Sequence, residues 1–96
     1  MKLVWIAYNE AVDEEVAEKL TSLGIASYTK WTGVLGAGRT SGPHLLSHVW
    51  PKGNYVLAAV VSDEVAATLM DALRDLRKKS GHEGVKAFLM KVEDQT

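Results

Sequence analysis

The residues best suited to binding chemistry gather in one glycine-rich segment, Gly33 to Gly53. It holds five of the eight glycines, both prolines and two of the three histidines, together with Arg39 and Lys52. Glycine-rich backbone can approach an anion closely, and arginine and lysine can neutralise its charge. Such turn-forming residues are poor core residues, and long loops in short chains are usually functional. We therefore expect this segment to carry the activity.

Composition excludes several other kinds of chemistry. The chain has no cysteine, which excludes disulfides, thiolate metal sites and cysteine nucleophiles. Its formal net charge is −1 and its longest basic run is Arg77 to Lys79, so nothing indicates nucleic-acid binding. Gly36 to Gly42 lacks the Gly-Lys-Ser/Thr of nucleotide-hydrolysing loops, and no nucleophile motif is present. We predict a non-catalytic protein, and the lack of a signal-peptide pattern predicts a cytoplasmic one.

Two similar segments flank the glycine-rich one, at positions 4–12 and 57–65. Each is an apolar strand that meets a helix-capping residue, Asn9 or Ser62, and then an acid in the first helical turn. Apolar stripes at helical spacing follow in both copies; they are Val12, Val16, Leu20 and Leu23, and Val65, Leu69, Leu73 and Leu76. Gly24 is placed to end the first helix.

Further strands are predicted at Ser27 to Val34 and Val85 to Val92, which completes the order βαββαβ. This order predicts one α+β domain over residues 1–96, a ferredoxin-like four-stranded antiparallel sheet with two helices on one face. The first and third strands are apolar at nearly every position, as in strands buried on both faces. Because two helices cover only one face, we expect the other face to meet further subunits of a homo-oligomer. Trp5 and Trp31 are interpreted as core or interface residues.

A family resemblance rests on four motifs in register. Gly36 to Gly42, GAGRTSG, resembles the G-x-G-R-x-x-G segment that opens the T-loop of the PII nitrogen-regulatory proteins. Pro51-Lys52 resembles the Pro-Lys that closes that loop, and Val60 to Glu64 resembles the start of the second helix. Gly81 to Phe88, GHEGVKAF, resembles the B-loop and the strand after it.

The resemblance implies a trimer-forming fold, a T-loop-like segment at about 36–53 and a B-loop-like segment at about 80–86. PII proteins hold ATP or ADP in clefts between subunits and dock on transporters or enzymes through the T-loop. The implied ligand-binding residues are Gly36, Gly38, Arg39, Lys52 and Lys86. The resulting interpretation is a PII-like signalling homotrimer of nitrogen regulation. It requires no cofactor, binds a nucleotide (ATP, ADP or AMP) or a small anion, and signals through its loop, for example to a membrane transporter.

The sequence also departs from the family pattern. The stretch between Gly42 and Pro51 is shorter than in standard PII proteins and has no tyrosine, so uridylylation there is not available. Glu83-Gly84-Val85 precedes Lys86 where the family has Gly-Asp-Gly, and a carboxylate and a β-branched residue suit a phosphate poorly. The sequence stops before the C-terminal arginines that bind phosphates in the family. We therefore expect weak or absent ATP binding.

The histidines support an alternative. If Pro43 starts a short helical turn, His44 and His48 lie on one face at a spacing that suits a transition metal. His82 of a neighbouring subunit would complete such a site. The alternative is then a divalent-transition-metal-binding trimer, like the CutA proteins of the same fold, linked to metal homeostasis or to an efflux pump. The other possibility is that these histidines are ordinary polar loop residues.

Overall fold

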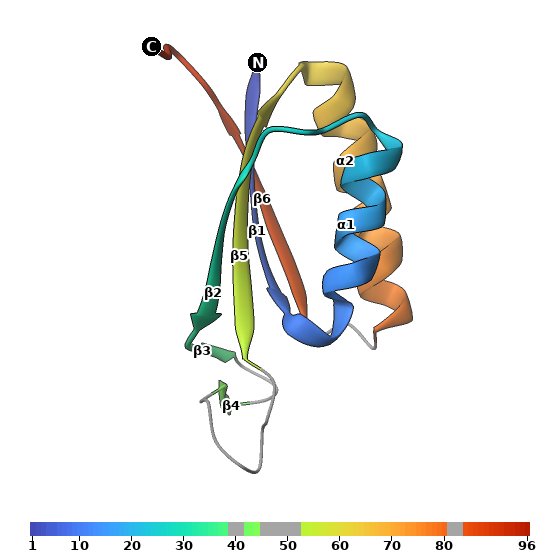
Figure 1. Ribbon diagram of the computed structural model, residues 1–96, viewed down its shortest axis with the longest axis vertical. Helices are drawn as coiled ribbons and strands as arrows, with labels where there is room; N and C mark the ends of the chain where they lie inside the picture. The colour runs from blue at the N-terminus through green and yellow to red at the C-terminus, as the bar shows by residue number, and fades with distance from the viewer. Residues whose placement is uncertain (39–41, 45–52, 81–83) are drawn as a thin grey trace.

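The computed structural model describes residues 1–38, 42–44, 53–80 and 84–96. Its elements in chain order are β1 (Lys2–Asn9), the 3-10 helix η1 (Glu10–Val12), α1 (Asp13–Ser22), β2 (Thr29–Val34), β3 (Gly36–Gly38), β4 (Gly42–His44), β5 (Asn54–Val61), α2 (Asp63–Lys79) and β6 (Val85–Lys91). Figure 1 shows both helices on one side of the large sheet, and both chain ends at the end of the sheet opposite β3 and β4. Neither described helix is long and apolar enough to cross a membrane.

The large sheet has the strand order β2-β5-β1-β6, and all its pairings are antiparallel. The central strand β1 pairs along its length with β5 and β6, from Lys2 opposite Val61 to Asn9 opposite Asn54. The predicted ferredoxin-like arrangement is confirmed. We call the end at Asn9 and Asn54 the loop end, and the end at Lys2 and Val61 the terminal end.

The helices start and stop where capping residues satisfy their free backbone groups. The Ser62 side chain accepts a hydrogen bond from the Val65 N–H at 3.2 Å, which caps α2 as predicted. Asn9 caps in the same way, but what it caps is η1, so α1 starts three residues later than the pattern indicates, at Asp13. Gly24 has a φ of 70° and follows α1, and the Ile25 N–H reaches back to the Leu20 carbonyl at 2.9 Å. A side chain at Gly24 would be strained in this left-handed conformation.

The core lies between the helices and one face of the sheet. Val4, Ile6 and Tyr8 alternate along β1 on this face and are almost completely buried. The predicted helical stripes meet them. The second stripe is shifted at its start, because Ala66 is fully buried while Val65 is only partly so.

A polar cluster holds α1 against the sheet at the edge of this core. The Asp13 carboxylate accepts a 2.7 Å hydrogen bond from the Tyr8 hydroxyl and a 2.8 Å hydrogen bond from the Lys30 ammonium. Burial raises the pKa of the Asp13 carboxyl, but the hydrogen bonds from Lys30 and Tyr8 outweigh it and hold the pKa below its ordinary value. Burial and the same Asp13 hydrogen bond raise the pKa of Tyr8.

The opposite face of the sheet is apolar and has no helix over it in the described structure; we call it the open face. Its residues lie at alternate positions along each strand and include Leu3, Trp5, Trp31, Ala58, Val60, Phe88 and Met90. Trp5 lies opposite both Ala58 and Phe88, and the Trp5 and Phe88 rings are 5.9 Å apart. Trp31 and Phe88 are each 48% exposed. The predicted uncovered apolar face is therefore confirmed.

Candidate ligand-binding site

The end of β1 holds both predicted loop segments at the loop end of the sheet. The Asn9 N–H donates a 2.8 Å hydrogen bond to the Gly84 carbonyl, within the B-loop-like segment. The next amide, that of Glu10, donates a 2.9 Å hydrogen bond to the Gly53 carbonyl, at the end of the T-loop-like segment. Two segments about thirty residues apart in the chain are thus fixed by neighbouring backbone groups.

Gly36 and Gly38 lie in a short hairpin below the sheet. β3 pairs with β4, Gly36 opposite His44 and Gly38 opposite Gly42. A Cβ atom at Gly36 would come within 3.3 Å of the Asn54 side-chain nitrogen, a contact tighter than most real ones. Glycine at position 36 therefore lets the loop backbone approach β5 closely. Arg39 and Lys52 lie outside the described residues.

Lys86 lies at the start of β6 on the open face. It stands opposite Ala7, its side chain is exposed, and its ammonium lies 5.7 Å from the centroid of the Phe88 ring. Gly84, two residues earlier, has a φ of 78°, a conformation that glycine adopts readily. The structure thus brings the backbone of Gly36 and the first residues of β6, including Lys86, to the same end of the sheet, while the Lys86 ammonium points along β6 toward Phe88.

One sequence-based objection to phosphate binding is corrected by the fold. The sequence pattern predicts that Val85 lines a phosphate site poorly, because it directly precedes Lys86. Val85 instead points into the core, is 4% exposed and lies opposite Tyr8. Its carbonyl accepts a 3.0 Å hydrogen bond from Arg77, which fixes the start of β6. Its side chain therefore has no contact with a ligand on the open face.

The helical turn expected at Pro43 is wrong as well. Pro43 and His44 belong to β4 and pair with Ala37 and Gly36, because the backbone forms a hairpin here in place of a helix. The helical turn that would bring His44 and His48 together therefore does not start at Pro43, and His48 and His82 lie outside the described residues. Within the described part of the chain, no three His, Cys, Asp or Glu side chains are placed to hold a metal ion.

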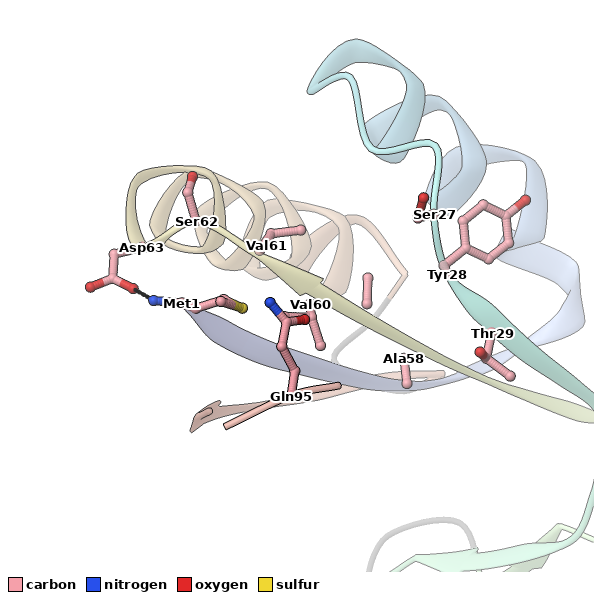
Figure 2. Close-up of a pocket in the computed structure, with 11 residues that line it drawn as sticks. Met1, Ser27, Tyr28, Thr29, Ala58, Val60, Val61, Ser62, Asp63 and Gln95 are labelled. Atoms are coloured by element: carbon pink, nitrogen blue, oxygen red, sulfur yellow. Dashed lines mark hydrogen bonds and ion pairs between the residues drawn. The ribbon is translucent and has the colours of Figure 1, made fainter. Parts of the chain in front are cut away.

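A second feature, which the sequence did not indicate, lies at the terminal end. β1 and β5 stay paired as far as Val61, but the pairing of β2 with β5 begins only at Thr29 and Ala58. Figure 2 shows Ser27 and Tyr28 leaving β5 at this point, which opens a wedge beside Val60. The resulting open pocket has a volume of about 850 Å³, within the range of small-molecule sites. We call it the wedge pocket; it is lined by Met1, Ser27, Tyr28, Thr29, Ala58, Ala59, Val60, Val61, Ser62, Asp63 and Gln95.

The wedge pocket suits a flat, weakly charged group. The backbone of β5 beyond Ala58 has no β2 partner in the described sheet, so its N–H and C=O groups on that side are open to a ligand. Asp63, the one acidic residue among those that line the wedge pocket, is paired with the N-terminal ammonium of Met1 at 2.6 Å. A heteroaromatic ring with donors and acceptors on its edge matches this lining.

The sequence model of the family "Nitrogen regulatory protein P-II" matches residues 1–96, so this chain belongs to the P-II family. No curated protein matches the sequence significantly. Among solved structures, CPII from Thiomonas intermedia K12, a nitrogen regulatory PII-like protein bound to ADP, AMP and bicarbonate, is 21% identical, with a TM-score of 0.75 over 97% of this chain and 88% of CPII. A PII-like signalling protein from Thermus thermophilus is 25% identical, with a TM-score of 0.65 over 95% of this chain and 84% of its own. CPII has also been solved with ADP, AMP and acetate.

Proposed function

We propose that this protein is a non-catalytic regulatory homotrimer that binds a nucleotide or a small anion in clefts between its subunits. The observation that carries the proposal is an apolar open face with candidate binding groups at both of its ends. The ligand then changes the order of the T-loop-like segment, and with it the partner protein on which the segment docks. A transporter is the kind of partner that the family resemblance implies.

The open face supports assembly. An exposed, contiguous apolar patch of this kind is typical of an interaction surface. It consists of one apolar face from each of four strands, and the aromatic side chains of Trp5, Trp31 and Phe88 supply much of its area. Packing of these faces against one another around an axis removes them from water.

The separation of the two binding features supports a site between subunits. Asn54 at the loop end and Val60 in the wedge pocket are six residues apart along β5, which corresponds to about 20 Å. One nucleotide therefore cannot use both features of a single chain. In an assembly, the wedge pocket of one subunit can hold the base while Gly36 and Lys86 of the next subunit meet the phosphates. CPII, solved with ADP and AMP, supports the choice of an adenine nucleotide.

The test is calorimetric titration of the assembled protein with AMP, ADP and ATP. We expect AMP or ADP to bind and ATP to bind at least about tenfold more weakly, because Lys86 is the one cation that the described residues place at the loop end of the open face and ATP carries the larger negative charge. Lys86→Gln should weaken ADP binding. Lys91→Gln removes the same charge from an exposed residue at the far end of β6 and is the matched control. Absence of binding by all three nucleotides, or equal losses in the two variants, would contradict the proposal.

A further inference from the structure

One residue, Asn9, carries the backbone connection between the two loop-like segments. β1 lies between β5 and β6 in the sheet, and successive N–H groups of a strand point to opposite sides. The Asn9 N–H therefore meets Gly84 on the β6 side, and the Glu10 N–H meets Gly53 on the β5 side, at 2.8 and 2.9 Å. Because peptide units are planar, only the φ and ψ of Asn9 separate these two N–H groups. A rotation at Asn9 that breaks one of the hydrogen bonds also misaligns the other.

The side chain of Asn9 holds these two angles in place. The φ of −71° and the ψ of 139° are extended, and the side-chain oxygen accepts a 2.8 Å hydrogen bond from the Ala11 N–H. On the other side, a Cβ atom at Gly84 would lie 3.4 Å from the Cβ atom of Asn9, so the Gly84 backbone packs directly against Asn9. The conformation of Asn9 is therefore tied both to the start of η1 and to the B-loop-like segment.

The chain beyond Gly84 is firmly anchored. The side chain of Val85 is 4% exposed, and the Val85 carbonyl accepts a 3.0 Å hydrogen bond from Arg77. Gly84 itself, with a φ of 78°, is the conformationally free position before this anchor. A displacement of Gly84 is thus not absorbed by β6 and reaches Asn9.

The chain beyond Gly53 is anchored in the same way. Gly53 is buried, and two residues later the Tyr55 ring packs edge-on against Tyr8, with 5.9 Å between the ring centroids. The Lys30 ammonium lies 4.7 Å from the centroid of the Tyr55 ring and is itself paired with Asp13 at 2.8 Å. These contacts fix the start of β5, so a rotation at Asn9 changes the hydrogen bond to Gly53 and leaves the strand where it is.

We propose that Asn9 couples the B-loop-like segment to the T-loop-like segment within one subunit, as a regulatory device built into the ligand site. With both hydrogen bonds formed, each segment is held at its glycine, and rotation of Asn9 releases both glycines together. A ligand that holds one segment therefore also holds the other. This inference rests on the proposed function, because it states how ligand contact at one segment reaches the other, but the coupling itself is measurable without ligand.

The experiment removes one hydrogen bond and follows the other. Glu10→Pro deletes the N–H group that donates to Gly53. Proline suits the first position of a helical turn, and the extended Asn9 is compatible with a proline after it. Glu10→Ala is the matched control, because it removes the same side chain, including its hydrogen bond with Tyr55, and keeps the N–H group.

The readout is hydrogen exchange of the Asn9 amide, measured by NMR in the ligand-free protein. We expect this amide to exchange at least about threefold faster in Glu10→Pro than in Glu10→Ala, since one backbone hydrogen bond changes an equilibrium by about three- to tenfold. The Ile25 amide, which donates to Leu20 after α1, reports on the rest of the fold and should exchange equally in the two variants. Equal exchange of the Asn9 amide in the two variants would overturn the inference.

A second pair of variants tests the reverse direction and keeps the test decisive if Glu10→Pro fails to fold. Gly84→Ala strains the backbone at the Gly84 carbonyl, and Gly24→Ala introduces a similar strain after α1, where φ is 70°. We expect the Glu10 amide, which donates to Gly53, to exchange faster in Gly84→Ala than in Gly24→Ala. Equal exchange of the Glu10 amide in these two variants would also overturn the inference.

Addition of ADP to the wild type separates this inference from the proposed function. We expect bound ADP to slow exchange of the Asn9 and Glu10 amides together. Bound ADP that slows one amide and leaves the other unchanged would overturn the inference alone. Absence of ADP binding would contradict the proposed function, and the two ligand-free comparisons would still decide whether Asn9 couples the segments.

Discussion

Phe88 offers the sharpest test of assembly through the open face, because its neighbour in the chain is a matched control. Phe88 is 48% exposed on the open face, and Leu89, the next residue, is 44% exposed on the opposite face of the same edge strand. We expect Phe88→Ala to weaken the trimer strongly and Leu89→Ala to leave it intact. Both truncations remove similarly exposed side chains, so the comparison isolates the face.

The size of the effect follows from the exposed area. A phenylalanine side chain buries about 200 Å² when fully covered, so its exposed half offers about 100 Å² to a partner subunit. At about 25 cal/mol per Å², this is about 2.5 kcal/mol per subunit and about 7 kcal/mol for three. About 7 kcal/mol changes the trimer dissociation constant by about five decades. Because three chains associate, the concentration of half-dissociation rises by half as many decades, about 300-fold.

Sedimentation velocity over a dilution series, from micromolar to nanomolar protein, measures this midpoint. Assembly through the open face is refuted if the wild type sediments as a 10.5 kDa monomer at micromolar concentration. It is also refuted if Leu89→Ala shifts the midpoint as far as Phe88→Ala does. A shift of only a few-fold for Phe88→Ala would place Phe88 outside the interface and leave the remainder of the open face to be tested.

Three further predictions concern backbone strain, pH and metal. Gly84→Ala should lower the free energy of unfolding by about 1–2 kcal/mol, because the φ of Gly84 is 78°. Gly24, with a φ of 70°, is the matched control, and Gly24→Ala should lower the free energy of unfolding equally in denaturant titrations. Only Gly84→Ala should also weaken ADP binding. The pKa of Asp13 is lowered in the folded protein, so its carboxylate stabilises the fold above the ordinary carboxyl pKa, and this contribution is lost as pH falls through the folded-state pKa. Asp13→Asn should therefore be less stable than the wild type by about 1 kcal/mol at pH 7. A difference in the free energy of unfolding that persists below pH 3 would contradict this. If a divalent metal binds, His44→Ala with His48→Ala should abolish it, and equal affinity for Zn²⁺ in calorimetry would remove the histidine hypothesis.

The fold could be predicted from the sequence because its local signals agree with its packing. The two capping residues, the glycine after α1 and the helical stripes all specify the elements in which they are found. Alternation along the strands specifies which face each residue takes, and it places Trp31 on the open face and Lys30 beside Asp13. The start of α1 was missed because the Asn9 cap is followed by a 3-10 turn, which the same residue pattern does not distinguish from α-helix.

The site was predicted less completely, because it depends on register and contacts between distant residues. Gly36 and Lys86 were indicated by motif, but the close approach of Gly36 to Asn54 of β5 is seen only in the structure. Val85 was misjudged because a single-residue change of register decides whether a side chain faces the core or a ligand. The wedge pocket arises where two strand pairings end at different residues, and periodicity carries no information about that difference.

If the ligand site is shared between subunits, ligand binding and assembly must be linked. A ligand that binds only the trimer stabilises it by mass action, so ADP should lower the concentration at which the wild type dissociates. The coupling is reciprocal, so Phe88→Ala should weaken ADP binding at protein concentrations below its shifted midpoint and leave it unchanged well above that midpoint. A ligand held within one subunit would show neither effect. Calorimetry of Phe88→Ala at two protein concentrations, one on each side of the measured midpoint, therefore decides whether the cleft between subunits is the binding site.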